Sequence, residues 1–171
     1  MRIENYDNST EVVSGGHKDY SIFLAGPTPR SKEVKSWRPE ALKIFQSLEF
    51  GGTLYYPEFH GPINIAEIDI RQDIYEWERK RLYNSDLILM WLPRSEDLPG
   101  LTSNIEFGEH VGSMKLFFGH PKDALKCRYM DWMYKEVTKR NSIDTLEGLI
   151  KECCRRIKMA DIEKKIAQRK K

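Results

Sequence analysis

The sequence predicts an α/β fold, a flavodoxin-like or Rossmann-like three-layer fold with a parallel sheet of about five strands. Two observations lead to this prediction. Short apolar runs of strand length alternate with longer segments whose apolar residues recur at helical spacing. Glycine and proline mark the turns between them. Ligands of such folds bind at the carboxyl ends of the strands, so the loops after the predicted strands are the expected location of a site.

The predicted elements follow one another without a repeat or a low-complexity segment. In chain order they are strand 20–25, helix 37–50, strand 53–56, helix 67–83, strand 87–92, a helix that Glu106 opens, strand 115–118, helix 123–134, strand 136–138 and a final helix from 146 to about 160.

Turn residues set the limits of the first three elements. The first strand breaks at Gly26-Pro27. The helix that follows has Pro39 in its first turn, where proline is tolerated, and Gly51-Gly52 ends it. The second strand therefore begins at Thr53.

Apolar periodicity defines the middle of the chain. Ile70, Ile74 and Trp77 recur at helical spacing and predict an amphipathic helix. The unbroken apolar run 87–92 is typical of a strand that is buried on both faces. A shorter run ends at Gly119 and predicts the fourth strand.

The end of the chain is expected to be a helix with a charged, fraying terminus. Leu146, Leu149 and Ile157 mark its apolar face, and it is expected to fray beyond Ala160. We therefore expect one domain over 19–160, preceded by a flexible arm at 1–18 and followed by a basic helix end at 161–171.

Composition excludes several function classes. The 171 residues include 28 basic and 26 acidic ones, a net charge of +2 that is too balanced for a body that binds a nucleic-acid polymer. No apolar run is long enough to span a membrane and no signal peptide is visible, so a cytoplasmic protein is expected. The three cysteines and four histidines form no metal-binding pattern, and we expect neither a metal nor a cofactor.

Two carboxylates bracket the strand 87–92. Asp86 stands at its entrance, and Glu106 is expected in the first turn of the helix that follows the next loop. A helix N-terminus carries about half a positive charge, so Glu106 is expected to be an anion at neutral pH. Local patterns also allow structural roles. Ser103 and Glu106 fit a capping box, and Asp86 fits a turn between helix and strand.

Short motifs in a fixed order extend over residues 20–135. They are FLAGPTPR at 23–30, SWR at 36–38, YPE at 56–58, WE at 77–78, SD at 85–86, WLPR at 91–94, PGLTSNIEFG at 99–108 and GHP at 119–121. In this order they resemble the signature of the nucleoside 2-deoxyribosyltransferase-like family. The resemblance implies that Glu106 is the nucleophile and that Asp86 assists at the base.

Further substrate-binding residues are expected in the loops that carry these motifs. They are Gly26, Pro27, Thr28, Arg30, Glu58, Asp97, Thr102 and Asn104. Asp97 and Asn104 are alternatives for one loop position that is acidic in the classical bacterial transferases. Other roles stay open, since Arg30 fits a surface position, Glu58 fits an ion pair with Arg38, and Asn104 fits loop closure.

The resemblance implies transfer of a 2-deoxyribosyl group between nucleobases through a covalent glycosyl-glutamate intermediate. The expected partners are a nucleoside or nucleotide and a free nucleobase. Two alternatives remain, a nucleoside or nucleoside monophosphate N-glycosidase that uses the same carboxylates, and a non-catalytic nucleotide-binding module.

A homo-oligomer is also expected. Related transferases close their sites with residues from a neighbouring subunit, and here the aromatic helix with Tyr129, Trp132 and Tyr134 and the C-terminal helix are available for contact. For Tyr129 and Trp132 taken singly, a core position is the favoured interpretation.

Overall fold

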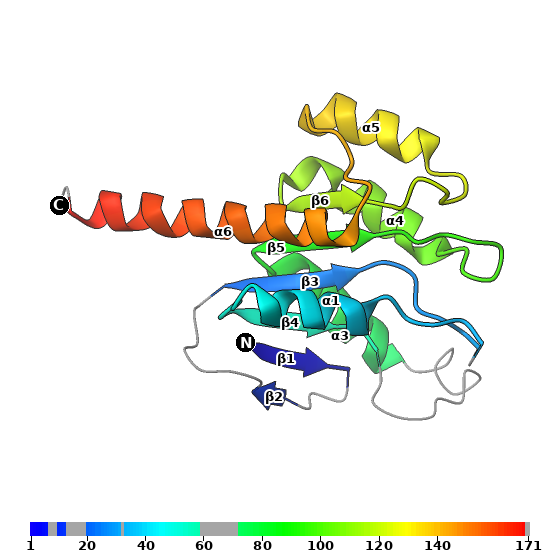
Figure 1. Ribbon diagram of the computed structural model, residues 1–171, viewed down its shortest axis with the longest axis horizontal. Helices are drawn as coiled ribbons and strands as arrows, with labels where there is room; N and C mark the ends of the chain where they lie inside the picture. Colours follow the sequence, from blue (N-terminus) through cyan, green and yellow to red (C-terminus); the bar gives the residue numbers. More distant parts are fainter. Residues whose placement is uncertain (7–9, 13–19, 32, 59–71, 170–171) are drawn as a thin grey trace.

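The computed structural model in Figure 1 describes residues 1–6, 10–12, 20–31, 33–58 and 72–169. Its strands are β1 (Arg2–Asn5), β2 (Thr10–Val12), β3 (Ser21–Ala25), β4 (Thr53–Tyr56), β5 (Leu87–Trp91) and β6 (Leu116–Gly119). Its helices are α1 (Arg38–Ser47), α3 (Gln72–Asn84), α4 (Leu101–His110), a 3-10 turn η1 (Val111–Ser113), α5 (Arg128–Thr138) and α6 (Leu146–Arg169).

The strands form one six-stranded sheet in the order β2-β1-β4-β3-β5-β6. Neighbouring strands from β1 to β6 are parallel, whereas β2 pairs antiparallel with β1 at the edge. Helices cover both faces of the sheet (Figure 1). The predicted three-layer fold with five parallel strands is therefore confirmed.

Alternate residues of each strand serve two separate cores. In β3, Ile22 and Leu24 are packed in a cluster with α1 and α6. Phe23 and Ala25 belong to the opposite cluster, with α3, α4 and α5. This arrangement follows from the period of two along a strand, which sends successive side chains to opposite faces. Because both faces are buried, the strands read as apolar runs rather than as alternating patterns.

The N-terminal residues are part of the sheet, so the prediction of a loose arm over 1–18 is wrong where the structure describes them. Strand β1 pairs with β4, and Met1 and Ile3 are buried, with 2% and 4% of their surface exposed. This strand is difficult to predict, because a four-residue segment with one central apolar residue has no clear hydrophobic period. Strand β1 supplies the fifth parallel strand.

The strand predicted at 136–138 is also wrong, because these residues complete α5. The Thr138 hydroxyl donates a hydrogen bond to the Tyr134 carbonyl at 2.6 Å, and the helix ends at Lys139 with a left-handed φ of 58°. Val137 and Thr138 favour strands by propensity, but packing of the helix decides. The start predicted for this helix, residue 123, lies before its observed start at Arg128.

Helix α6 is longer than predicted and continues to Arg169. It runs along the sheet and then projects past the amino ends of the strands (Figure 1). The Tyr20 hydroxyl, just before β3, donates to the Asp161 carboxylate at 2.8 Å and marks where α6 leaves the body. In the part of the chain that the structure describes, α6 and the other helices are too polar or too short to cross a membrane. The start predicted for the second helix, residue 67, lies outside the described residues.

Candidate functional site

The loops after β3 and β5 meet at the carboxyl edge of the sheet. β3 leads to α1 on one face and β5 leads to α4 on the other, so the gap between these two strands is the topological switch point where such folds bind ligands. Gly26 has a φ of 139°, and a Cβ atom there would lie 2.2 Å from the carbonyl oxygen of Trp91. Glycine is therefore required for the two loops to come this close.

Arg38 holds the loop after β3 in place through hydrogen bonds. It is only 1% exposed, and its guanidinium donates to the carbonyls of Leu24 at 3.0 Å and Gly26 at 2.7 Å and to the Thr28 hydroxyl at 3.1 Å. Its charge is neutralised by Glu58, at 2.6 Å. A buried arginine with a partner of this kind fixes loop geometry rather than binding a ligand directly.

Glu58 is held within the protein by both of its carboxylate oxygens. One accepts hydrogen bonds from Arg38 and from the Ser36 hydroxyl, each at 2.6 Å, and the other accepts one from the Tyr56 hydroxyl at 3.1 Å. Of the two roles predicted for Glu58, the ion pair with Arg38 is the one that the structure contains.

Glu106 is half-buried on α4 and lies close enough to Glu78, half-buried on α3, for the two charges to repel each other. Tyr6, the residue after β1, donates its hydroxyl to Glu78 Oε1 at 3.1 Å. The Tyr6 ring packs edge-on against Trp77, with ring centroids 5.0 Å apart. Three elements that are distant in the sequence thus bring a phenol and two carboxylates together.

Burial and mutual repulsion hold protons on this pair. Burial, and then the charge of Glu78, raise the pKa of Glu106 to about 8, while the Arg38 guanidinium acts in the opposite direction. Burial also raises the pKa of Glu78 above its usual value, against the hydrogen bond from Tyr6. Near neutral pH the pair is therefore expected to hold one proton, leaving one carboxylate and one carboxylic acid.

The prediction that a helix N-terminus keeps Glu106 ionised is wrong. Helix α4 begins at Leu101, after Gly100 with a left-handed φ of 59°, so Glu106 lies in the second turn. Ser103 is inside the helix, and its buried hydroxyl has no hydrogen-bond partner among the described residues, so the capping box does not form. The field of a helix end fades within one turn, and at Glu106 burial dominates.

The predicted pairing of Glu106 with Asp86 is wrong as well. Asp86 precedes β5 and is exposed, at the amino edge of the sheet. Its carboxylate accepts hydrogen bonds from the Ser21 backbone amide at 2.8 Å and from the Ser21 hydroxyl at 2.9 Å. A five-residue parallel strand separates it from the carboxyl edge, a span of roughly 16 Å. Asp86 therefore joins β5 to β3, as the turn interpretation allowed.

The remaining predicted residues do not gather around Glu106 as one set. Arg30, Asp97 and Thr102 are exposed. The Pro27 carbonyl accepts a hydrogen bond from the Trp37 indole at 3.3 Å, in the same loop as Gly26 and Thr28. Asn104 lies on the far flank of α4 from Glu106, because two residues along a helix turn the direction by about 200°.

Two residues of this site, Glu78 and Tyr6, were not predicted as site residues. Glu78, in the Trp77-Glu78 motif, was open to two interpretations, burial against the site or exposure to water, and its place beside the buried Trp77 on an amphipathic helix was a signal for partial burial. Tyr6 fell in the segment taken for an arm. A short strand followed directly by a tyrosine would have been the signal, but the strand is recognised only when β1 is paired with β4.

Comparison with known proteins agrees with the motifs. Residues 19–124, more than half of the chain, match the family described as nucleoside 2-deoxyribosyltransferase like, and the chain therefore belongs to this family. No curated protein matches the chain. Within the described ranges, no group of three or more His, Cys, Asp or Glu side chains is placed to hold a metal ion.

Proposed function

We propose that this protein transfers a 2-deoxyribosyl group between nucleobases, with Glu106 as the nucleophile and Glu78 as the general acid and base. One observation carries the proposal: Glu106 and Glu78 interact electrostatically near the carboxyl edge, and burial raises the pKa of both. A retaining glycosyl transfer needs one ionised and one protonated carboxyl group, and a pair that shares one proton provides both. Family membership supports the substrate class.

The first half-reaction breaks the glycosidic bond. A Glu106 oxygen attacks the anomeric carbon, the bond from that carbon to the base nitrogen breaks, and the departing base takes the proton of Glu78. In the second half-reaction a nitrogen of the incoming base attacks the same carbon, the ester to Glu106 breaks, and Glu78 takes up the proton that the new base loses. Two inversions at one carbon give retention overall.

The shared proton has to be on Glu78 when Glu106 attacks. Arg38 stabilises the ionised form of Glu106, and Tyr6 can follow the proton on Glu78 because a phenol both donates and accepts. The hydrogen bond from Tyr6 in the free protein favours the ionised form of Glu78. Binding of a base that accepts a proton would reverse this preference.

The substrates are a nucleoside or nucleotide and a free nucleobase, used in nucleotide metabolism in the cytoplasm. Hydrolysis differs from transfer only in the acceptor, because water can resolve the ester to Glu106 in place of a base. We also propose that the protein is a homo-oligomer. Its exposed apolar stripe on the projecting end of α6, with Met159, Ile162 and Ile166 at helical spacing, favours self-contact.

Product analysis tests the proposal. The protein is incubated with each deoxynucleoside and each deoxynucleoside monophosphate, with and without a second free base, and all products are separated. A new nucleoside without free sugar establishes transfer, and free sugar establishes the N-glycosidase. If no substrate releases its base, the protein is not an enzyme of this class.

Trapping of the covalent intermediate tests the roles. Acid quench during turnover, followed by peptide mass spectrometry, is expected to find a deoxyribosyl adduct on Glu106. An adduct on Glu78 would reverse the two roles. Glu109→Gln is the matched control variant, and it should still form the adduct on Glu106. Glu109 is an exposed glutamate on the same helix, paired with Arg79 at 3.5 Å.

A further inference from the structure

Helix α4 borders a second concave site, on the flank away from Glu106. A groove of about 710 Å³ lies between α4, the start of α5 and the loops that precede them. This volume is in the range of small-molecule sites. Most of its lining is apolar and includes Leu101, Phe107, Tyr129, Met130 and Met133. Neither Glu106 nor Glu78 lines it, so it is separate from the proposed transfer site.

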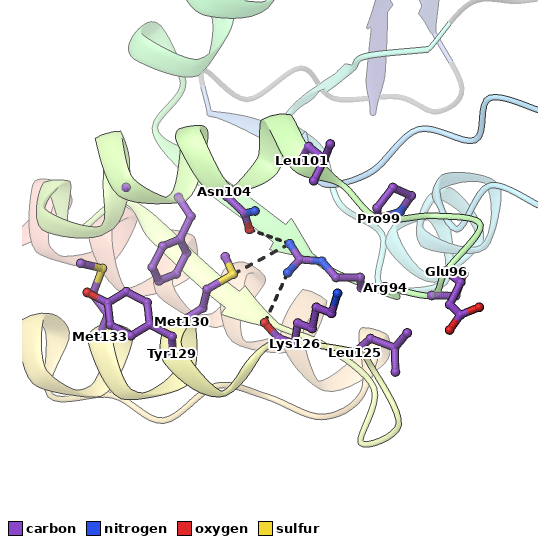
Figure 2. Close-up of a pocket in the computed structure, with 13 residues that line it drawn as sticks. Arg94, Glu96, Pro99, Leu101, Asn104, Leu125, Lys126, Tyr129, Met130 and Met133 are labelled. Carbon is purple, nitrogen blue, oxygen red and sulfur yellow. Dashed lines mark hydrogen bonds between the residues drawn. The ribbon is translucent and has the colours of Figure 1, made fainter.

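A buried cation lies at the bottom of this groove. Arg94 is 8% exposed, and Figure 2 shows its guanidinium directed between Asn104 and Lys126. It donates to the Asn104 side-chain oxygen at 2.7 Å, to the carbonyls of Gly100 and Lys126 at 3.4 Å each, and contacts the Met130 sulfur at 4.0 Å.

The partners of Arg94 among the described residues are all neutral, and these contacts leave its donors incompletely used. Two of the three oxygen contacts are long, and Nε has no hydrogen-bond partner in the described part of the chain. Among the described residues, no carboxylate lies within ion-pair distance of Arg94, in contrast to Arg38 with its Glu58. Glu96 also lines the groove, but in Figure 2 its carboxylate points away from the guanidinium.

An unpaired buried cation is unfavourable, and an anion in the groove would offset that cost. The guanidinium fork matches the geometry of a carboxylate, sulfonate or phosphate oxygen pair. The exposed Lys126 ammonium at the rim adds positive charge. Beyond Arg94, the aromatic and methionine side chains offer a surface for a flat apolar group.

We propose that the groove between α4 and α5 is a second ligand site, which binds a small organic anion with its charged group on Arg94 and its flat apolar body on Tyr129, Met130 and Met133. The site is independent of the chemistry at Glu106. Since α4 carries Glu106 on one flank and lines the groove with the other, a ligand here contacts the same helix as the transfer site.

A matched pair of ligands tests the need for charge. The probe is 2-naphthoate, and its control is 2-naphthalenemethanol, which has the same rings and no charge. Isothermal titration of the full-length protein is expected to give saturable one-to-one binding of 2-naphthoate and about tenfold weaker binding of the alcohol. No saturable binding of 2-naphthoate, or equal binding of the two, overturns the proposal.

A matched pair of variants locates the site. Tyr129 and Trp132 are both exposed on α5, at 66% and 58%, but only Tyr129 lines the groove. Tyr129→Glu is expected to weaken 2-naphthoate binding about tenfold by repulsion, and Trp132→Glu to leave it within about twofold. Equal weakening by both changes would place the ligand elsewhere and refute the assignment.

Removal of the cation completes the test. Arg94→Gln is expected to abolish the preference for naphthoate over the alcohol, with folding checked by thermal denaturation. If Arg94→Gln does not fold, the Tyr129 and Trp132 variants decide alone. Because the readout is binding, the result does not depend on whether the protein transfers deoxyribose.

Discussion

The two edges of the sheet treat their carboxylates in opposite ways. At the amino edge, Asp86 is exposed and accepts two hydrogen bonds from Ser21, which satisfies its charge. At the carboxyl edge, Glu106 is half-buried and is repelled by Glu78, so desolvation and repulsion both oppose its charge. Both acids flank β5 in the sequence. The comparison shows that the burial of a carboxylate and the charges beside it, rather than its position along the chain, distinguish a structural acid from a reactive one.

Activity gives the sharpest contrast between the edges. Glu106→Gln is expected to lower base exchange roughly a thousandfold or more, because it removes the nucleophile. Asp86→Asn is expected to change it less than about threefold, because its effect is confined to a hydrogen bond at the far edge. Initial rates of base exchange, measured by chromatography, check both. Comparable losses of the base-exchange rate in the two variants would mean that Asp86 takes part in catalysis.

The second carboxylate of the carboxyl edge is expected to act on the leaving group. Glu78→Gln should slow departure of an ordinary nucleobase roughly a hundredfold, since general acid catalysis contributes effects of this size. An activated substrate, whose base departs without protonation, should lose much less. The comparison of the two substrates in one variant separates acid catalysis from loss of structure, which would slow both alike.

The motifs and apolar runs predict most of the fold but only part of this site. The runs 20–25 and 87–92 identify strands because burial on both faces leaves an unmistakable apolar pattern. Glu106 follows from motif resemblance, whereas its partner depends on how α3 and α4 pack across β5, which local spacing does not encode. The error over Asp86 arose in this way. Asp86 precedes Glu106 by only 20 residues in the chain but lies at the other end of β5 in space.

Capping geometry was the second place where local pattern failed. Ser103 and Glu106 have the spacing of a capping box, yet Gly100 starts the helix in a left-handed conformation that the pattern does not anticipate. The helix starts three residues earlier than the capping box predicts, which places Glu106 on a buried flank in the second turn and reverses the expected direction of its pKa shift.

Stability is expected to depend on pH at the carboxyl edge, through Glu106. The pKa of Glu106 rises from 4.5 to about 8 on folding, so the folded chain holds this proton more tightly than the unfolded chain. The stability present below pH 4.5 is therefore lost as the pH rises to about 8.

Glu106→Gln removes this loss. The variant should be more stable than the unsubstituted protein by up to about 5 kcal/mol above pH 8, and similar to it near pH 4.5. Asp86→Asn should instead destabilise by about 1 kcal/mol, through weaker hydrogen bonds to Ser21. Urea denaturation at several pH values measures both effects. A Glu106→Gln variant that is less stable at high pH would contradict the raised pKa.

The smallest effect on activity is expected from the apolar stripe on α6, which lies beyond the amino edge (Figure 1). Of the aromatic residues expected to form a subunit contact, Tyr134 is buried, with 2% exposed, and is unavailable, whereas Tyr129 and Trp132 are exposed rather than in the core. On α6, Ile162 is 56% exposed at the centre of the stripe, and an isolated helix end of this length is marginal without a partner.

Ile162→Asp is therefore expected to convert an oligomer to a smaller species while base exchange stays within about twofold, because a contact beyond the amino edge does not reach Glu106. Light scattering coupled to chromatography measures the mass, and Glu163→Gln on the exposed part of the same helix is the control. A monomeric unsubstituted protein would reject self-association. If Ile162→Asp dissociates the protein and hydrolysis replaces exchange, the neighbouring subunit excludes water from the site, and the two edges are coupled through the assembly.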